Sequence, residues 1–125
     1  MSLTIQSHKG PYTVMLRTDV PDVLSDVKAA AGARRCHFIV DERLAGLQGS
    51  ALRGVQQSES VLSLAATEQN KNLDRFTAYA EHLVAKGVRR GDILVAIGGG
   101  IIQDVTCFLA STLLRGLDWH FYPTT

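Results

Sequence analysis

The stretch from Leu94 to Phe108 holds the residues whose types and spacing most strongly suggest chemistry. It reads LVAIGGGIIQDVTCF, an apolar run broken by three glycines, Gly98 to Gly100, with one acid, Asp104, in the apolar run that follows. A backbone without side chains can approach a phosphate closely, and the N–H groups at a helix start point toward an anion. A tight strand-to-helix turn without a ligand needs only one glycine, so three favour a phosphate-binding turn.

We expect Gln103 and Asp104 to lie in the first turn of the helix that follows the glycines, near the ligand. The alternative is that the helix dipole alone favours a carboxylate at this position. The pattern is not the G-x-G-x-x-G dinucleotide fingerprint, because Gln103 takes the place of the third glycine. The glycine block must therefore be interpreted together with its neighbours.

Three charged residues elsewhere in the chain could contribute to the same site. Asp41 ends the apolar run CHFIVD, where a carboxylate can accept from both hydroxyls of a ribose, or can cap a helix or lie in a solvated loop. Glu68 and Lys71 lie three residues apart where a strand gives way to a helix, and form either a ligand contact or a surface ion pair of little energetic value. The histidines have no metal-ligand spacing and are expected in the core or on the surface: His8, His37, His82 and His120.

Composition restricts the class of protein. The chain has 125 residues, 46% of them hydrophobic, and a net charge of +1, which is typical of one soluble domain and gives no electrostatic reason to expect nucleic acid or a membrane as partner. No apolar run approaches the roughly 18 residues needed to span a bilayer, and the start lacks the apolar region of a signal peptide. Cys36 and Cys107 lie in apolar surroundings and are expected as buried thiols in a cytoplasmic protein.

Periodicity predicts strands and helices in alternation. Residues 3–8 and 12–18 are expected to form a hairpin joined at Gly10-Pro11, and residues 101–114 to form the helix after the glycines. Residues 45–54 are expected to be irregular or weakly helical. The remaining predicted elements are a helix within 20–32, a strand ending at Asp41, a strand within 60–67, a helix within 72–87 with Leu73, Phe76, Tyr79, Ala80 and Leu83 facing inward, a buried strand before Gly98, and a strand within 117–125.

This order of elements predicts an α/β fold, with a Rossmann-like parallel sheet, crossover helices and an N-terminal β-hairpin, in one domain over residues 1–125. On such a sheet, ligands bind beyond the carboxyl ends of the strands. Asp41 and the three glycines fall at two of these ends.

The block from Gly91 to Thr125 resembles the glycine-rich core of 3-dehydroquinate synthase and the related sugar phosphate cyclases. In that family a GGG-x-x-x-D motif, a Phe, an R-G pair and a P-T-T sequence occur in this order. Upstream, ATEQNK resembles the family's G-E-x-x-K, with Thr67 in place of the glycine, and FIVDERL resembles the strand whose terminal acid holds the adenosine ribose of NAD. The matching residues are Asp41, Glu68, Lys71, Gly98 to Gly100, Asp104, Phe108, Arg115-Gly116 and Pro123-Thr124-Thr125.

The resemblance implies a role for each of these residues in an NAD-binding N-terminal domain. Asp41 would hold the adenosine ribose, and the three glycines would cradle the NAD pyrophosphate. Glu68 and Lys71 would contact the cofactor. The hydroxyls of Thr124 and Thr125 would also lie against it.

Two residues, Asp104 and Arg115, are the catalytic candidates. Asp104 would lie on the nicotinamide side, near the cofactor ribose or the substrate. Arg115 follows it by three helical turns, so both are expected on one helix face. The resemblance implies that Arg115 reaches across a homodimer interface to a substrate phosphate, while the alternative is a cation favoured by the helix C-terminus.

The implied reaction is a phosphate lyase that closes a carbocycle from a sugar phosphate such as DAHP, by transient oxidation, phosphate elimination, reduction and aldol closure. A divalent metal, zinc or cobalt, would assist, and the family takes its ligands from a second, helical domain. We expect neither that domain nor the metal ligands within these residues. The chain alone is therefore expected to bind NAD but not to turn over.

Other classes of function stay open. A departure from the family pattern, Gln103 before Asp104 and Thr106-Cys107 after it, suits another cyclase of secondary metabolism. A metal-dependent glycerol or alcohol dehydrogenase shares the superfamily but would produce net NADH. The third alternative is a non-catalytic nucleotide-binding or dimerisation module.

Overall fold

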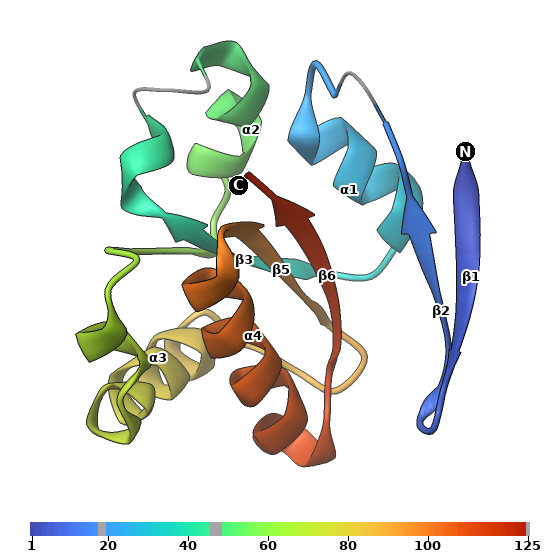
Figure 1. The fold of residues 1–125 in the computed structure, drawn as a ribbon. Helices are drawn as coiled ribbons and strands as arrows, with labels where there is room; N and C mark the ends of the chain where they lie inside the picture. Colours follow the sequence, from blue (N-terminus) through green and yellow to red (C-terminus); the bar gives the residue numbers. More distant parts are fainter. Residues whose placement is uncertain (18–19, 46–48, 125) are drawn as a thin grey trace.

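Four parallel strands form the sheet that organises the domain (Figure 1). The computed structural model of the chain describes residues 1–17, 20–45 and 49–124. Across the sheet the strands lie in the order β4-β3-β5-β6, so that β5 is a central strand, and all its residues are buried as its unbroken apolar run predicted. The strands are β3 (Cys36–Asp41), β4 (Val61–Leu64), β5 (Ile93–Gly98) and β6 (Asp118–Pro123).

Helices cover both faces of this sheet, because neighbouring residues of a strand point to opposite faces. Phe38 and Val40 of β3 pack into one apolar cluster with residues of α1 and α2, whereas Ile39 packs into a second cluster with residues of α3 and α4. The result is a three-layer arrangement that confirms the predicted α/β fold with crossover helices. The helices are α1 (Val23–Ala31), α2 (Arg53–Gln56), α3 (Leu73–Ala85) and α4 (Gly100–Thr112).

The predicted N-terminal hairpin is present as a separate two-stranded antiparallel sheet, β1 (Ser2–Ser7) and β2 (Gly10–Met15), beside the main body (Figure 1). Its turn lies at His8 and Lys9, because Gly10 already pairs with Ser7. The predicted connection at Gly10-Pro11 was therefore wrong by two residues.

Three further details differ from the sequence-based expectation. Leu73 is 68% exposed, so the inward face of α3 starts one turn later, at Phe76. Cys107 is an exposed free thiol and Cys36 is half-buried, so the two are not the buried pair expected, although neither forms a disulfide. The stretch predicted as irregular or weakly helical contains the short 3-10 helix Gly49–Leu52 and the start of α2.

The helix that follows the glycines ends earlier than predicted. α4 stops at Thr112, and a short 3-10 turn follows, Leu113–Arg115. Leu114 and Arg115 have positive φ angles, 52° and 67°, which an α-helix does not allow. The prediction of a helix through residue 114 therefore fails at its last turn.

A buried polar chain ties together the amino ends of three strands. His37 is fully buried, and its ring bonds Ser60 through Nδ1 at 2.6 Å and Asp92 through Nε2 at 2.8 Å. Because the carboxylate can only accept, Nε2 donates to it, and in the neutral ring Nδ1 accepts from the Ser60 hydroxyl. Asp92 also accepts from the Arg89 amide at 3.0 Å. Burial pushes the pKa of Asp92 upward, but the bonds from His37 and Arg89 outweigh burial and leave the pKa below its ordinary value.

We predict that Asp92→Ala lowers the free energy of unfolding by about 1–3 kcal/mol, because it strands the buried His37 N–H and the Arg89 amide without an acceptor. Since the folded pKa of Asp92 is depressed, its contribution is complete above the unfolded pKa of about 3.9 and is lost as pH falls through the folded value. Urea denaturation at neutral and acidic pH should show the two proteins converging in acid. Equal stability at pH 7 would contradict this role.

Candidate functional site

The carboxyl edge of the sheet gathers residues that are far apart in the chain. The strand order reverses between β3 and β5, because the chain leaves β3 toward β4 on one side, whereas β5 continues to β6 on the other. In open α/β sheets this reversal is the position at which ligands bind. Asp41 ends β3 and Gly98 ends β5, and the Thr124 amide donates to the Gly98 carbonyl at 2.9 Å.

The three glycines have different surroundings. Gly98 is buried with φ 157°, and a Cβ built on it would lie 2.6 Å from Cγ1 of Ile102 and 3.3 Å from Cβ of Asp41. Gly99 is the extended N-cap of α4, and no side chain in the described ranges caps this helix start. Gly100 is exposed, and a Cβ there would meet nothing within 4 Å. Gly98 is therefore needed for packing, whereas Gly100 leaves open space beside the first amides of α4.

Asp41 is held firmly at its strand end. Its side chain is 5% exposed, and Oδ1 accepts from the Arg43 amide at 3.0 Å and from Arg43 Nε at 3.3 Å. Oδ2 accepts from Arg43 Nη2 at 3.0 Å. These bonds outweigh burial and hold the pKa of Asp41 below its ordinary value. The carboxylate is thus ionised at neutral pH and fixed in orientation.

Glu68, Lys71 and Asp104 come together although Asp104 is distant in sequence. The ammonium of Lys71 lies 2.9 Å from Asp104 Oδ2 and 3.6 Å from Glu68 Oε2. The bond to Asp104 raises the pKa of Lys71, with smaller contributions from Glu68. Asp104 lies beyond the first turn of α4, so the expected first-turn position was wrong, and its side chain is 55% exposed. The trio presents two acids and one cation to solvent.

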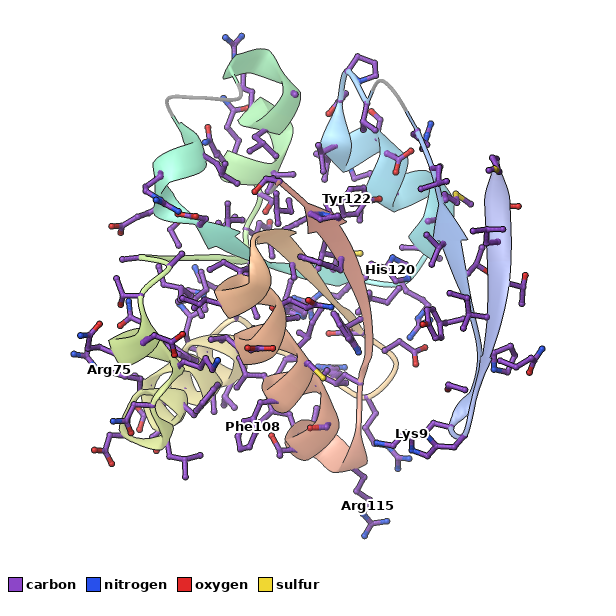
Figure 2. All side chains as sticks on the ribbon, in the orientation of Figure 1. Lys9, Arg75, Phe108, Arg115, His120 and Tyr122 are labelled. Carbon is purple, nitrogen blue, oxygen red and sulfur yellow. The ribbon has the colours of Figure 1, made fainter. Side chains whose placement is uncertain are left out.

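Arg115 does not share a helix face with Asp104. The positive φ angles of Leu114 and Arg115 take Arg115 off the axis of α4. The 13 residues of α4 span roughly 20 Å, and Arg115 follows the end of the helix that is remote from the glycines. In Figure 2 Arg115 points away from the body of the molecule, at the end opposite Tyr122. The single chain therefore does not bring Arg115 to the carboxyl edge.

The remaining predicted site residues divide between described and undescribed parts of the chain. Thr124 is exposed at the carboxyl edge, directly after β6, while Thr125 lies outside the described residues. Among the residues described, no group of three His, Cys, Asp or Glu side chains is arranged to hold a metal ion. Over the same residues no helix is long and apolar enough to cross a membrane.

Sequence reasoning missed Arg43, although it lies only two residues after the strand-end acid. The available signal was a forked cation next to a predicted ligand-binding carboxylate. It expected His37 in the core or on the surface and named no partner for it, whereas His37 links Ser60 and Asp92 in the bonding order of a hydrolase triad. Ser60 is only 5% exposed and lies at the amino edge, so this chain of bonds serves the fold.

Fold and site together define a doubly wound α/β domain with a candidate anion-binding turn at its switch point. Residues 61–125, slightly more than half of the chain, match the family model of the 3-dehydroquinate synthase N-terminal domain. The chain belongs to this family, which confirms the resemblance read from the sequence.

Relatives with two different names match the chain at the same percentage identity. It is 32% identical to a 3-dehydroquinate synthase of Opitutus terrae, over 99% of this chain and 35% of that protein. It is also 32% identical to a 2-deoxy-scyllo-inosose synthase of Streptomyces kanamyceticus, over 98% of this chain and 32% of that protein. The chain thus spans about a third of the length of these relatives.

A solved structure shares the fold. The crystal structure of 2-deoxy-scyllo-inosose synthase complexed with carbaglucose-6-phosphate, NAD+ and Co2+ superposes with a TM-score of 0.75 at 18% identity. The match covers 99% of this chain and 35% of that one. At this identity the likeness shows the fold alone.

We predict different effects on stability for alanine substitutions at Gly98 and Gly100. Gly98→Ala should lower the free energy of unfolding by about 1–3 kcal/mol, because its methyl group overlaps the buried Ile102. Gly100→Ala should leave stability unchanged or slightly higher, since the methyl enters open space and alanine favours a helix. Thermal unfolding of both variants provides the comparison. If the two variants lost stability equally, the distinct roles given to Gly98 and Gly100 would be wrong.

Proposed function

We propose that this domain binds NAD across the carboxyl edge of its sheet. The observation that carries the proposal is the convergence of Asp41, the glycine turn and the Glu68–Lys71–Asp104 trio at the point where the strand order reverses. Each of these elements comes from a different connection. Their side chains and exposed amides offer acceptors for ribose hydroxyls and donors for phosphate.

The described residues fit such a cofactor. The open space at Gly100 is a volume that a Cβ would occupy, and it adjoins helix amides that no described side chain caps. A diphosphate there would take the place of the missing cap. The Asp41 carboxylate is ionised and held by the Arg43 backbone amide, so it can accept from the two hydroxyls of a ribose when the exposed Arg43 guanidinium turns aside.

The charged groups of the Glu68–Lys71–Asp104 trio would position the part of the cofactor beyond the adenosine and the diphosphate. Lys71 is charged at neutral pH at its ordinary pKa, and Asp104 and Glu68 raise that pKa further. Its ammonium can turn from Asp104 toward a cofactor oxygen, which frees the Asp104 carboxylate for a ribose or substrate hydroxyl. Thr124 and Thr125 are proposed to add hydroxyl contacts beyond β6, where the Thr124 amide already holds Gly98.

We propose that the protein containing this domain is a sugar phosphate cyclase of the 3-dehydroquinate synthase type, and thus a phosphate lyase. The chemistry that NAD supplies when bound is the reversible oxidation of a substrate hydroxyl. Asp104 is the residue proposed to orient that hydroxyl. The described residues do not fit a divalent metal, so no step here is assigned to one.

The substrate proposed first is that of 3-dehydroquinate synthase, DAHP, because the matching family model carries that description. The second candidate is a hexose phosphate similar to the carbaglucose-6-phosphate bound in the solved 2-deoxy-scyllo-inosose synthase, and the 32% identity to a relative of that name supports it. Release of phosphate without accumulation of NADH would separate either cyclase from a dehydrogenase.

The proposed assembly is a homodimer in which Arg115 serves the site of the partner subunit. Its position supports this role, because Arg115 points outward at the far end of α4 and cannot serve the site of its own chain (Figure 2). A forked guanidinium suits a substrate phosphate.

Calorimetric titration of the purified chain with NAD tests the cofactor site. We expect saturable binding that weakens at least tenfold in Asp41→Ala, which loses the acceptor for the ribose, and in Gly100→Ala, whose methyl fills the phosphate space. Lys71→Met should also weaken binding while leaving thermal stability almost unchanged, because exposed ion pairs contribute little.

Arg90→Gln, an exposed cation near the amino ends of the strands, is the matched control and should bind NAD as the parent chain does. Absence of NAD binding in well-folded parent chain would refute the proposal. Phosphate release from a sugar phosphate by the chain alone would refute the expectation that it needs a second domain for turnover.

A further inference from the structure

The exposed guanidinium of Arg43 covers the carboxylate that is proposed to select the cofactor. Side-chain and amide nitrogens of Arg43 make three hydrogen bonds to Asp41, at 3.0, 3.3 and 3.0 Å, and both carboxylate oxygens are used. The two partners differ sharply in exposure, since the Asp41 side chain is 5% exposed and that of Arg43 is 70% exposed. The cation therefore forms the solvent-facing surface of this corner, and the acid lies behind it.

The Arg43–Asp41 pair presents a different charge to the cofactor ribose than a lone carboxylate would. A lone carboxylate at a strand end accepts from the 2′- and 3′-hydroxyls and repels a 2′-phosphate, which is how such sites select NAD over NADP. Here the guanidinium of Arg43 offsets the charge of the Asp41 carboxylate, and the exposed Glu42 between them in sequence is the acid of this corner that no ion pair among the described residues offsets. The repulsion that normally excludes a 2′-phosphate is offset by a forked donor suited to phosphate oxygens.

The bonds of Arg43 also divide into a fixed part and a movable part. The amide bond to Oδ1 belongs to the backbone and holds the carboxylate whether or not the side chain moves. The guanidinium contributes Nε and Nη2, while Nη1 takes no part in these bonds. The side chain can thus turn toward a phosphate with Nη1 and Nη2 while the backbone amide keeps Asp41 in place.

We infer that Arg43 makes the adenosine-ribose corner accept a 2′-phosphate, so that the domain binds NADP as well as NAD. The inference rests on the proposed cofactor site and specifies its selectivity. Unphosphorylated ribose bonds to Asp41 after the guanidinium turns aside, and a 2′-phosphorylated ribose bonds to the guanidinium itself. Arg43 is the specificity-determining residue in both cases.

The test measures the dissociation constants of NAD and NADP by calorimetry for the parent chain and three variants. We expect the parent chain to bind the two within about tenfold of each other. Arg43→Asn should weaken NADP by roughly tenfold to a hundredfold, because the charge-assisted bonds to the phosphate are lost, and should weaken NAD by much less. Arg43→Lys keeps the positive charge but not the forked guanidinium, so its affinity for NADP should lie between those of the parent chain and of Arg43→Asn.

Asp41→Asn supplies the reciprocal change. It leaves one neutral amide oxygen in place of two charged acceptor oxygens and removes the repulsion of phosphate, so it should weaken NAD more than NADP. The readout is the ratio of the dissociation constants of NAD and NADP. Partial unfolding of a variant lowers the number of binding sites for both cofactors equally, so it does not change this ratio. Arg90→Gln again serves as control, with an unchanged ratio.

The same measurements with adenosine 2′,5′-bisphosphate and 5′-AMP repeat the comparison at the adenosine end alone. Preference of the parent chain for NAD by more than a hundredfold would overturn this inference and leave the NAD site standing. Equal weakening of both cofactors in Arg43→Asn would also overturn it, because Arg43 would then hold only the shape of the corner. If the folded parent chain bound none of the four ligands, the NAD site and this inference would fail together.

Discussion

The close packing at the end of β5 is the constraint on which the candidate site depends. Gly98 lies so near Ile102 of α4 and Asp41 of β3 that a side chain there has no room. Because nothing separates these elements, the start of α4 and the end of β3 meet at one corner of the sheet. The Thr124 amide bonds the Gly98 carbonyl and brings the end of β6 to the same corner. The missing side chain at Gly98 thus allows three features to meet at this corner. They are the start of α4, the Asp41 carboxylate and the exposed residue after β6, Thr124.

The amino edge of the sheet contributes to stability, whereas the carboxyl edge carries the candidate binding groups. At the amino edge, His37, Ser60 and Asp92 satisfy one another and are buried, which is the arrangement that rigidifies a core. At the carboxyl edge the charged groups are exposed or can change partner, since Lys71 lies between two acids and Arg43 covers Asp41 from the solvent side. Groups that exchange hydrogen bonds with a ligand must be able to leave their partners, and Lys71 and Arg43 are such groups at the carboxyl edge.

Local patterns predicted the elements well where one interaction dominates. The apolar run of β5, the stop of α1 at Gly32 and the acid at the end of β3 are each decided within a few residues. The errors have equally physical causes. Leu73 faces solvent because α3 has only begun at that residue, and the positive φ at Leu114 follows from the turn that leads into β6 rather than from any local preference.

The sequence by itself determined the alternation of strands and helices, the family, and the identity of Asp41 and the glycines as candidates, because each depends on neighbouring residues. Tertiary structure alone decided which of them meet. The contact of Lys71 with Asp104 joins the segment after β4 to the helix after β5, and the strand order that creates it is not encoded in any short motif. It also decided that Gly98 serves packing while Gly100 leaves space, and that Arg115 lies at the remote end of α4. These outcomes depend on atoms brought close by long-range packing, which spacing along a chain cannot specify.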